Sequence, residues 1–215
     1  MNPDNMKKRI LMSVIGVVVS GISVGMFKFA ALGVDPFQTF MAGTDALLPI
    51  RFGTLYVIVN GLLLLFAIVF DRKKIGIATL INLFLLGYIA EYTQYIMRQR
   101  LLQPGYPVRF GILAFAVVIL CLATSLYFTA DLGVSPYDAL ALIWSQRQNK
   151  LPFAACRVIG DLASVLIGTL FCVAAGFGLQ QVLEVVGIGT VITAFFMGPL
   201  IEFFNVHVAR PLLNR

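Results

Sequence analysis

Six long apolar stretches follow one another along the 215-residue chain, and only short polar connections separate them. A helix needs about 20 apolar residues to cross roughly 30 Å of hydrocarbon, and each stretch is long enough. Apolar residues make up 60% of the chain and charged residues 12%, unlike a soluble domain. The pattern predicts an all-α membrane protein with six transmembrane helices. The predicted spans are 10–32, 52–70, 75–97, 110–132, 152–177 and 182–206.

A short motif interrupts the chain after the first and the fourth stretch. It reads Leu-Gly-Val-Asp-Pro-Phe at 32–37 and Leu-Gly-Val-Ser-Pro-Tyr at 132–137. Glycine ends a helix readily, proline fits the first position of a new helix, and Asp or Ser caps the exposed amides. We therefore expect each motif to end one helix and to begin another, over 35–48 and 135–148. About 14 residues give about 21 Å of helix, which predicts re-entrant or interfacial half-helices.

The two motifs belong to an internal repeat. Residues 30–37 match 130–137 at an offset of 100, and residues 76–91 match 187–202 at an offset of 111. Two matches in the same order predict two copies, 1–100 and 101–215, which together form one membrane domain. Each copy contains three spans, so the second copy enters the membrane from the opposite side. The copies are therefore predicted to be inverted, as in many secondary transporters.

Basic residues gather at the ends of the spans, and we read the net charge of +6 as a topology signal rather than as affinity for nucleic acid. Six spans place ten Lys and Arg residues on the side of both termini and four on the other, which predicts cytoplasmic termini. If the half-helices also crossed, the copies would be parallel and the count eleven against three. Charge counting alone does not decide between these topologies.

The two breaks are the first candidates for a binding site, because irregular backbone inside a bilayer must be buried in protein or must line a water-filled cavity. An inverted repeat would bring both breaks together near the midplane. The alternative is that both motifs are ordinary surface turns. The expected solute-binding residues are Gly33, Asp35, Pro36, Phe37, Gly133, Ser135, Pro136, Tyr137 and Asp138.

Charged side chains inside the spans are candidates for ion coupling, because charges are costly at membrane depth. Arg157 and Asp161 lie one turn apart and can pair, either as a structural ion pair or with Asp161 as a proton- or cation-binding carboxylate. Glu91 and Glu202 occupy equivalent positions in the two copies, although each could instead reach solvent at the end of its span.

Small residues at 76, 79, 187, 189 and 190 predict close helix packing, and the alternative is a binding surface of exposed backbone. Cys121, Cys156 and Cys172 fall inside spans without metal-ligand spacing, which favours a packing role. His207 is the only histidine, and the chain has no nucleotide-binding motif. We therefore expect no enzymatic activity, no metal and no cofactor.

The repeated Leu-Gly-Val-x-Pro-aromatic motif, together with the downstream Gly-Ile-x-Thr-x7-Gly-x3-Glu element, resembles the YczE/YitT family of small bacterial integral membrane proteins. The resemblance covers nearly the whole chain. It implies a multi-pass protein of the bacterial inner membrane, and some relatives have been proposed to export small molecules. It brings no substrate-binding residues with it.

These observations predict a secondary transporter or facilitator of a small organic solute, in which two halves rock around a midplane site. Protons would couple through Asp161, Glu91 or Glu202. The alternatives are a passive channel for an anion, attracted by the half-helix amino ends, and a non-transporting accessory protein. The expected partners are the solute and the lipid bilayer, and the small size of the chain is compatible with a homodimer.

Overall fold

The computed structural model describes residues 3–71, 75–102, 104–148 and 153–214, and the regular structure of these residues is helical throughout. This confirms the predicted all-α class. The helices are α1 (Pro3–Ala30), α2 (Pro36–Leu47), α3 (Phe52–Phe70), α4 (Ile77–Arg100), α5 (Tyr106–Ala130), α6 (Pro136–Gln148), α7 (Phe153–Ala174), α8 (Leu179–Val185), α9 (Ile188–Phe204), η2 (Asn205–Ala209) and α10 (Arg210–Asn214).

Within the described ranges, five helical segments are long and apolar enough to cross a membrane. Four belong to α1, α3, α5 and α7, and the fifth is the stretch from α8 into α10. They agree with five of the six predicted spans. The other prediction, 75–97, coincides with α4, whose 24 residues include Glu91, Arg98 and Arg100. Length and composition alone therefore do not place α4 among the spanning helices.

The last predicted span, 182–206, is not a single helix. The chain breaks at Val186 and Gly187 between α8 and α9, and α9 continues into the π-helical turn η2. The break occurs because Gly187 is the N-cap of α9, where its amide donates to the Thr190 hydroxyl (3.3 Å). The turn after α7 and helix α8 occupy residues 175–185, which matches the growth of the repeat offset from 100 to 111.

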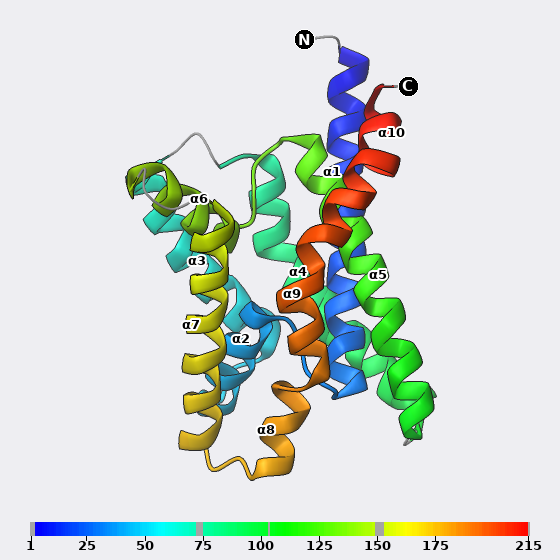
Figure 1. The fold of residues 1–215 in the computed structure, drawn as a ribbon, viewed down its shortest axis with the longest axis vertical. Coiled ribbons are helices and arrows are strands. Elements are labelled where there is room, and N and C mark those ends of the chain that lie inside the picture. Colours follow the sequence, from blue (N-terminus) through cyan, green and yellow to red (C-terminus); the bar gives the residue numbers. More distant parts are fainter. Residues whose placement is uncertain (1–2, 72–74, 103, 149–152, 215) are drawn as a thin grey trace.

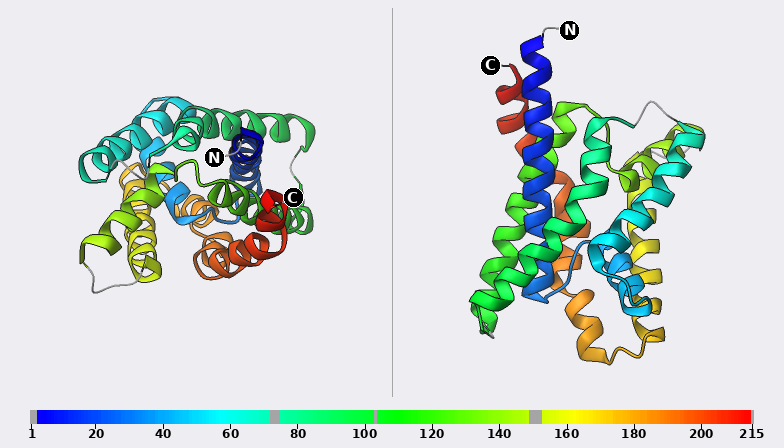
Figure 2. Two further views of the ribbon diagram at one scale, coloured as in Figure 1. Left: turned by 90° about the horizontal axis from the view of Figure 1, so that it is seen from above. Right: turned by 180° about the vertical axis from the view of Figure 1, so that it is seen from behind.

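The long helix α1 organises the packing. It makes its most extensive contacts with α4 and α5, while α2 packs against α7 and α6 packs against both α3 and α7. Figure 1 shows α1 running away from the end that carries α10, and α5 running back toward that end beside it. The views in Figure 2 place α2 between α1 and α7, in the interior of the bundle.

Both breaks have the local structure that their sequence predicts. Gly33 and Gly133 have φ angles of 100° and 110°, which an L side chain rarely adopts. Helix α2 begins at Pro36 with Asp35 as its N-cap, whose carboxylate accepts from an amide of the first turn (3.1 Å). At the start of α6, the Ser135 hydroxyl accepts in the same way from the third following amide (3.1 Å). The predicted capping is confirmed.

Each break pairs with backbone and side chains of the other half of the chain. The amides of Gly33 and Val34 donate to carbonyl oxygens of α8, at 3.0 Å each, and the Leu32 carbonyl accepts from the Gly189 amide (2.8 Å). In the other break, the Leu132 carbonyl accepts from the Ala78 amide (3.0 Å). These bonds satisfy backbone groups that a bilayer could not, so neither break is a simple surface turn.

The small residues at 76 and 187 allow this pairing. A Cβ added to Gly76 would lie 1.9 Å from the Leu132 carbonyl oxygen, and one added to Gly187 would lie 2.5 Å from that of Leu32. The predicted close approach is present at these glycines, but the predicted contact between helices is not what they make. The surface that these glycines approach is the backbone of a break, however, and not the side of a neighbouring helix.

Two arginines cap the helices that precede the breaks. Arg109 donates through Nε to the Ala30 carbonyl (2.6 Å) and through Nη2 to the Ala31 carbonyl (2.7 Å), at the end of α1. Arg9 donates through Nη1 to the Ala130 carbonyl (2.9 Å), at the end of α5. The charge and hydrogen bonds satisfy the last carbonyls of each helix. Arg9 and Arg109 are 100 residues apart, so the caps follow the repeat.

Replacing Gly76 with alanine should lower the free energy of unfolding by about 1–3 kcal/mol, because the new methyl group overlaps the Leu132 carbonyl. The control is Gly61→Ala in α3, where an added Cβ meets no atom of the described structure within 4 Å. Thermal unfolding in detergent measures both. Equal midpoints for the two variants would contradict the close backbone contact.

Replacing Arg109 with glutamine should lower the free energy of unfolding by about 1.5–3 kcal/mol, because the end of α1 loses two hydrogen bonds from a charged donor. Arg100→Gln, an exposed arginine at the end of α4, is the matched control and should change stability little. The same unfolding measurement compares them. A loss for Arg100→Gln as large as that for Arg109→Gln would show a general charge effect.

Candidate functional site

The two breaks bring the first turns of α2 and α6 together. The rings of Phe37 and Tyr137 stack with their centroids 4.7 Å apart. These residues occupy equivalent positions in the repeat, 100 residues apart. Phe37 also meets the ring of Tyr56 on α3 edge-on, at 6.0 Å. The two motifs singled out in the sequence therefore meet in the interior.

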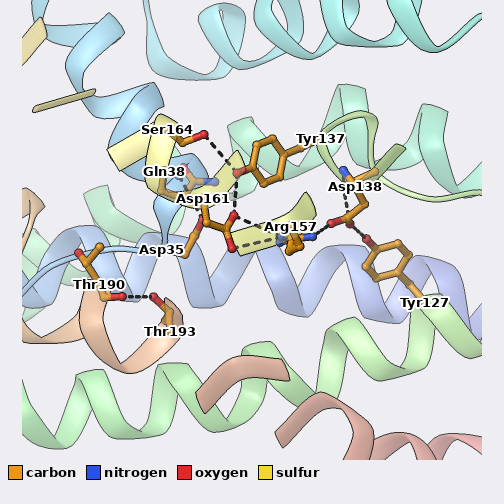
Figure 3. A network of polar contacts seen from close by, with 11 residues as sticks. Asp35, Gln38, Tyr127, Tyr137, Asp138, Arg157, Asp161, Ser164, Thr190 and Thr193 are labelled. Atoms are coloured by element: carbon orange, nitrogen blue, oxygen red, sulfur yellow. Dashed lines mark hydrogen bonds and ion pairs between the residues drawn. The ribbon is translucent and has the colours of Figure 1, made fainter. Parts of the chain in front are cut away.

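An ion network lies beside these rings, and its centre is Arg157 on α7 (Figure 3). Its Nε donates to Asp161 Oδ1 (3.3 Å), one turn further along the same helix, and its Nη1 donates to Asp138 on α6. The Tyr137 hydroxyl donates to Asp161 Oδ1 (2.7 Å) and lies 3.1 Å from the hydroxyl of Ser164. Residues of α6 and α7 are thus joined by one network.

The carboxylate of Asp138 is held by three groups. Besides Arg157, the hydroxyls of Tyr127 on α5 and of Ser135 each donate to its Oδ2 at 2.6 Å, and its own amide donates to Ser135. The side chain of Asp138 is 8% exposed. A buried carboxylate needs such partners, because an unpaired charge in a low dielectric is very costly.

Asp35 adds a third carboxylate near the network. Figure 3 shows its side chain close to that of Asp161. Two buried amide oxygens, Gln38 Oε1 in the first turn of α2 and Asn60 Oδ1 on α3, have no hydrogen-bond partner in the described structure. Buried oxygens without partners are uncommon in proteins and mark places where water, a proton or a solute can bind.

A cavity of about 620 Å³ reaches this network from α3, α6 and α7. Its inner wall includes Tyr137, Arg157 and Ser164, which belong to the network. Figure 1 shows α6 and the beginning of α7 in the same half of the molecule as α10. The other lining residues are Phe66, Phe70, Leu140, Ala141, Ile143, Trp144, Arg147, Gln148, Cys156 and Gly160.

The predicted binding residues have different places. Tyr137 lines the cavity, and Ser135 and Asp138 belong to the network behind it. Asp35 and Phe37 lie next to the network. Gly33, Gly133, Pro36 and Pro136 shape the two breaks and do not line the cavity.

The predicted ion-coupling residues divide into two groups. Arg157 and Asp161 are paired at the network. Glu91 and Glu202 form ion pairs outside the network. Glu91 accepts from Arg51 Nε (3.3 Å) and from the Gly53 amide, and Glu202 pairs with Arg210 (3.6 Å). The structure does not bring these glutamates to the breaks: Glu91 on α4 is held at the start of α3, and Glu202 is held by Arg210 at the start of α10.

Sequence reasoning did not identify several residues of the site. Tyr127 and Ser164 complete the network from within apolar stretches, where one hydroxyl carries no pattern. Trp144 and Arg147 line the cavity from the end of α6. These two residues are three apart and therefore share a helix face, which is the feature of the sequence that could have identified them. Among the described residues, no cluster of three His, Cys, Asp or Glu side chains could hold a metal ion.

The apolar helices and the enclosed ion network define a multi-pass helical membrane protein. Residues 7–206 match a family of unknown function, DUF6198, and the chain belongs to this family.

Two relatives come from Bacillus subtilis (strain 168). The chain is 23% identical over 206 residues to the uncharacterized protein YyaS, with 94% of each chain covered. It is 23% identical over 200 residues to the uncharacterized membrane protein YczE, with 93% of this chain and 86% of YczE covered. The resemblance to YczE noted in the sequence is confirmed. No solved structure matches the chain.

Replacing Tyr127 with phenylalanine should destabilise the protein by about 1.5–3 kcal/mol, because Asp138 loses a hydrogen bond at a buried charge. Tyr88→Phe is the control, since Tyr88 is exposed and its hydroxyl lies 3.3 Å from that of Thr54. Thermal unfolding in detergent compares the pair. Equal stability of both variants would mean that Asp138 does not depend on Tyr127.

Proposed function

We propose that the protein is a secondary transporter or facilitator that moves a small organic solute across the bacterial inner membrane by alternating access. The observation that carries this proposal is a cavity that ends at a buried ion network, at the place where two interrupted helices meet. Transporters commonly place their solute between interrupted helices at the junction of two structural repeats.

The proposed architecture has six spans in two inverted halves, with α4 as the sixth span and α2 and α6 as re-entrant half-helices. The opposite directions of α1 and α5 in Figure 1 support it. So do the reciprocal contacts, since the break of each half bonds to a glycine-rich helix start in the other. The arginine caps at the ends of α1 and α5 are reciprocal as well.

The two halves are packed unequally, which supports alternating access. Helix α2 approaches α7 so closely that a Cβ on Gly43 would lie 2.2 Å from the Gly168 carbonyl oxygen. The corresponding pair, α6 and α3, borders the 620 Å³ cavity. If α6 closed on α3 while α2 moved away from α7, the site would open to the opposite side of the membrane. With cytoplasmic termini, as the basic residues predict, the structure would face the cytoplasm.

Replacing Gly168 with valine should block transport, because α2 could no longer close on α7. The control is Gly111→Val in α5, where an added Cβ meets no described atom within 4 Å. The solute is first identified by a thermal-shift screen of the purified protein, and its exchange across liposomes is then measured. We expect Gly168→Val to remain folded and to lose at least about tenfold in exchange. Full exchange by this variant would contradict the rocking motion.

Proton coupling is proposed to run through Asp161, the more exposed of the two carboxylates that share Arg157. Asp161→Asn should therefore abolish accumulation driven by a pH gradient while leaving downhill exchange intact. Glu202→Gln, a change at an exposed glutamate paired with Arg210, serves as the control. Undiminished accumulation by Asp161→Asn would reject the coupling role, and unitary currents far above transporter turnover would instead indicate a channel.

A further inference from the structure

The polar groups that face the cavity identify the charge of its ligand. The lining includes two cations, Arg147 and Arg157, and none of the described lining residues is acidic. The remaining lining side chains that can donate a hydrogen bond are those of Tyr137, Trp144, Gln148, Cys156 and Ser164. The carboxylates of the ion network lie behind the guanidinium and not on the cavity wall.

The exposed fractions of the network side chains also indicate that the guanidinium, rather than the carboxylates, faces the cavity. The side chain of Arg157 is 28% exposed, against 8% for Asp138 and 15% for Asp161. Its hydrogen bonds within the described structure use Nε and Nη1. A guanidinium has five N–H groups, so the two on Nη2 remain for a ligand that carries acceptor oxygens.

The rest of the cavity wall is mostly aromatic and aliphatic. Phe66, Phe70 and Trp144 face it together with aliphatic residues of α6. The guanidinium of Arg147 lies 4.4 Å from the centroid of the Phe70 ring, which holds this cation against the apolar wall. Such a lining favours a ligand with an apolar body and one charged group.

We propose that the solute is an organic monoanion with an apolar body, whose acid group binds Nη2 of Arg157 while its body lies against Phe66, Phe70 and Trp144. This inference rests on the proposed function and adds the chemical class of the solute to it. The second cation, Arg147, attracts the acid group at the side of the cavity formed by the end of α6.

Binding of the anion also explains how a proton would be carried. The acid group competes with Asp161 for Arg157, and Asp161 then takes up a proton from water in the cavity. The other charged and titratable groups around Asp161 are Arg157, Asp35, Tyr137 and Asp138 (Figure 3). One anion and one proton would move together, so that the loaded site gains no net charge.

Trp144 is the only tryptophan of the chain and it lines the cavity, so its fluorescence reports binding directly. The test uses three probes of similar shape: benzoate, benzylamine and benzyl alcohol. We expect benzoate to change the fluorescence of the purified full chain at a concentration at least about tenfold lower than the other two. Equal or tighter binding of benzylamine, or no response to benzoate and the longer phenylacetate, overturns the proposed class.

Variants then locate the acid group. Arg157→Lys keeps the charge but removes Nη2 with its two N–H groups, and should weaken benzoate binding at least about tenfold. Asp161→Asn removes the competitor, so benzoate should bind more tightly and with less dependence on pH. Arg210→Gln, outside the cavity, should change neither property. Unchanged benzoate binding by Arg157→Lys overturns the assignment.

Failure of this inference can be separated from failure of the proposed function. A cationic or neutral solute that is exchanged across liposomes would overturn the anion class and leave alternating access intact. Benzoate binding without exchange of any solute would have the opposite meaning, because the site would hold an anion in a protein that does not transport.

Discussion

The structure depends on one constraint, which is that a helix interrupted inside a bilayer leaves backbone amides and carbonyls that lipid cannot satisfy. This chain meets the constraint by giving each break a partner in the other half. The carbonyls of Leu32 and Leu132 both accept from amides near the start of a helix in the opposite half. Glycine at 76 and 187 follows from this arrangement, because any side chain would separate the two backbones.

The ion network follows from the same arrangement. Once α6 restarts in the interior, Asp138 lies in its first turn and requires a cation and hydroxyl donors. Arg157 supplies the charge and is shared with Asp161, so neither buried carboxylate is left alone. Such a network is costly to break but can exchange partners, because a carboxylate that loses its guanidinium can bind a proton instead. A packed apolar core offers no comparable response to an ion or a solute.

Local features of the site could be predicted from the sequence. Glycine and proline at the breaks, and Asp35 and Ser135 as caps, act through their own backbone geometry and short hydrogen bonds, so a few adjacent letters are sufficient. The Arg157–Asp161 pair was likewise evident, since residues four apart share a helix face. The internal repeat showed that Phe37 and Tyr137 occupy equivalent positions, but it did not show that their rings are in contact.

Tertiary contacts could not be predicted in the same way. The roles of Arg9 and Arg109 depend on helix ends about a hundred residues distant, and basic residues near span ends are equally expected from topology alone. Glu91 and Glu202 were equivalent in sequence, yet ion pairs with Arg51 and Arg210 hold them away from the breaks. The break before α9 was missed because apolar residues continue through it, and only the change of repeat offset indicated an insertion.

The central claim is that the two halves are oppositely oriented and that α2 and α6 each return to the side from which they entered. Single cysteines at Leu48 and Gln148, in a chain with Cys121, Cys156 and Cys172 replaced by serine, test it most directly through labelling of intact cells with an impermeant maleimide. We predict that position 48 is labelled from outside, and that position 148 is labelled only after the membrane is opened. If position 48, like position 148, is labelled only after the membrane is opened, the half-helices cross completely and the two copies are parallel, which would contradict the inverted arrangement.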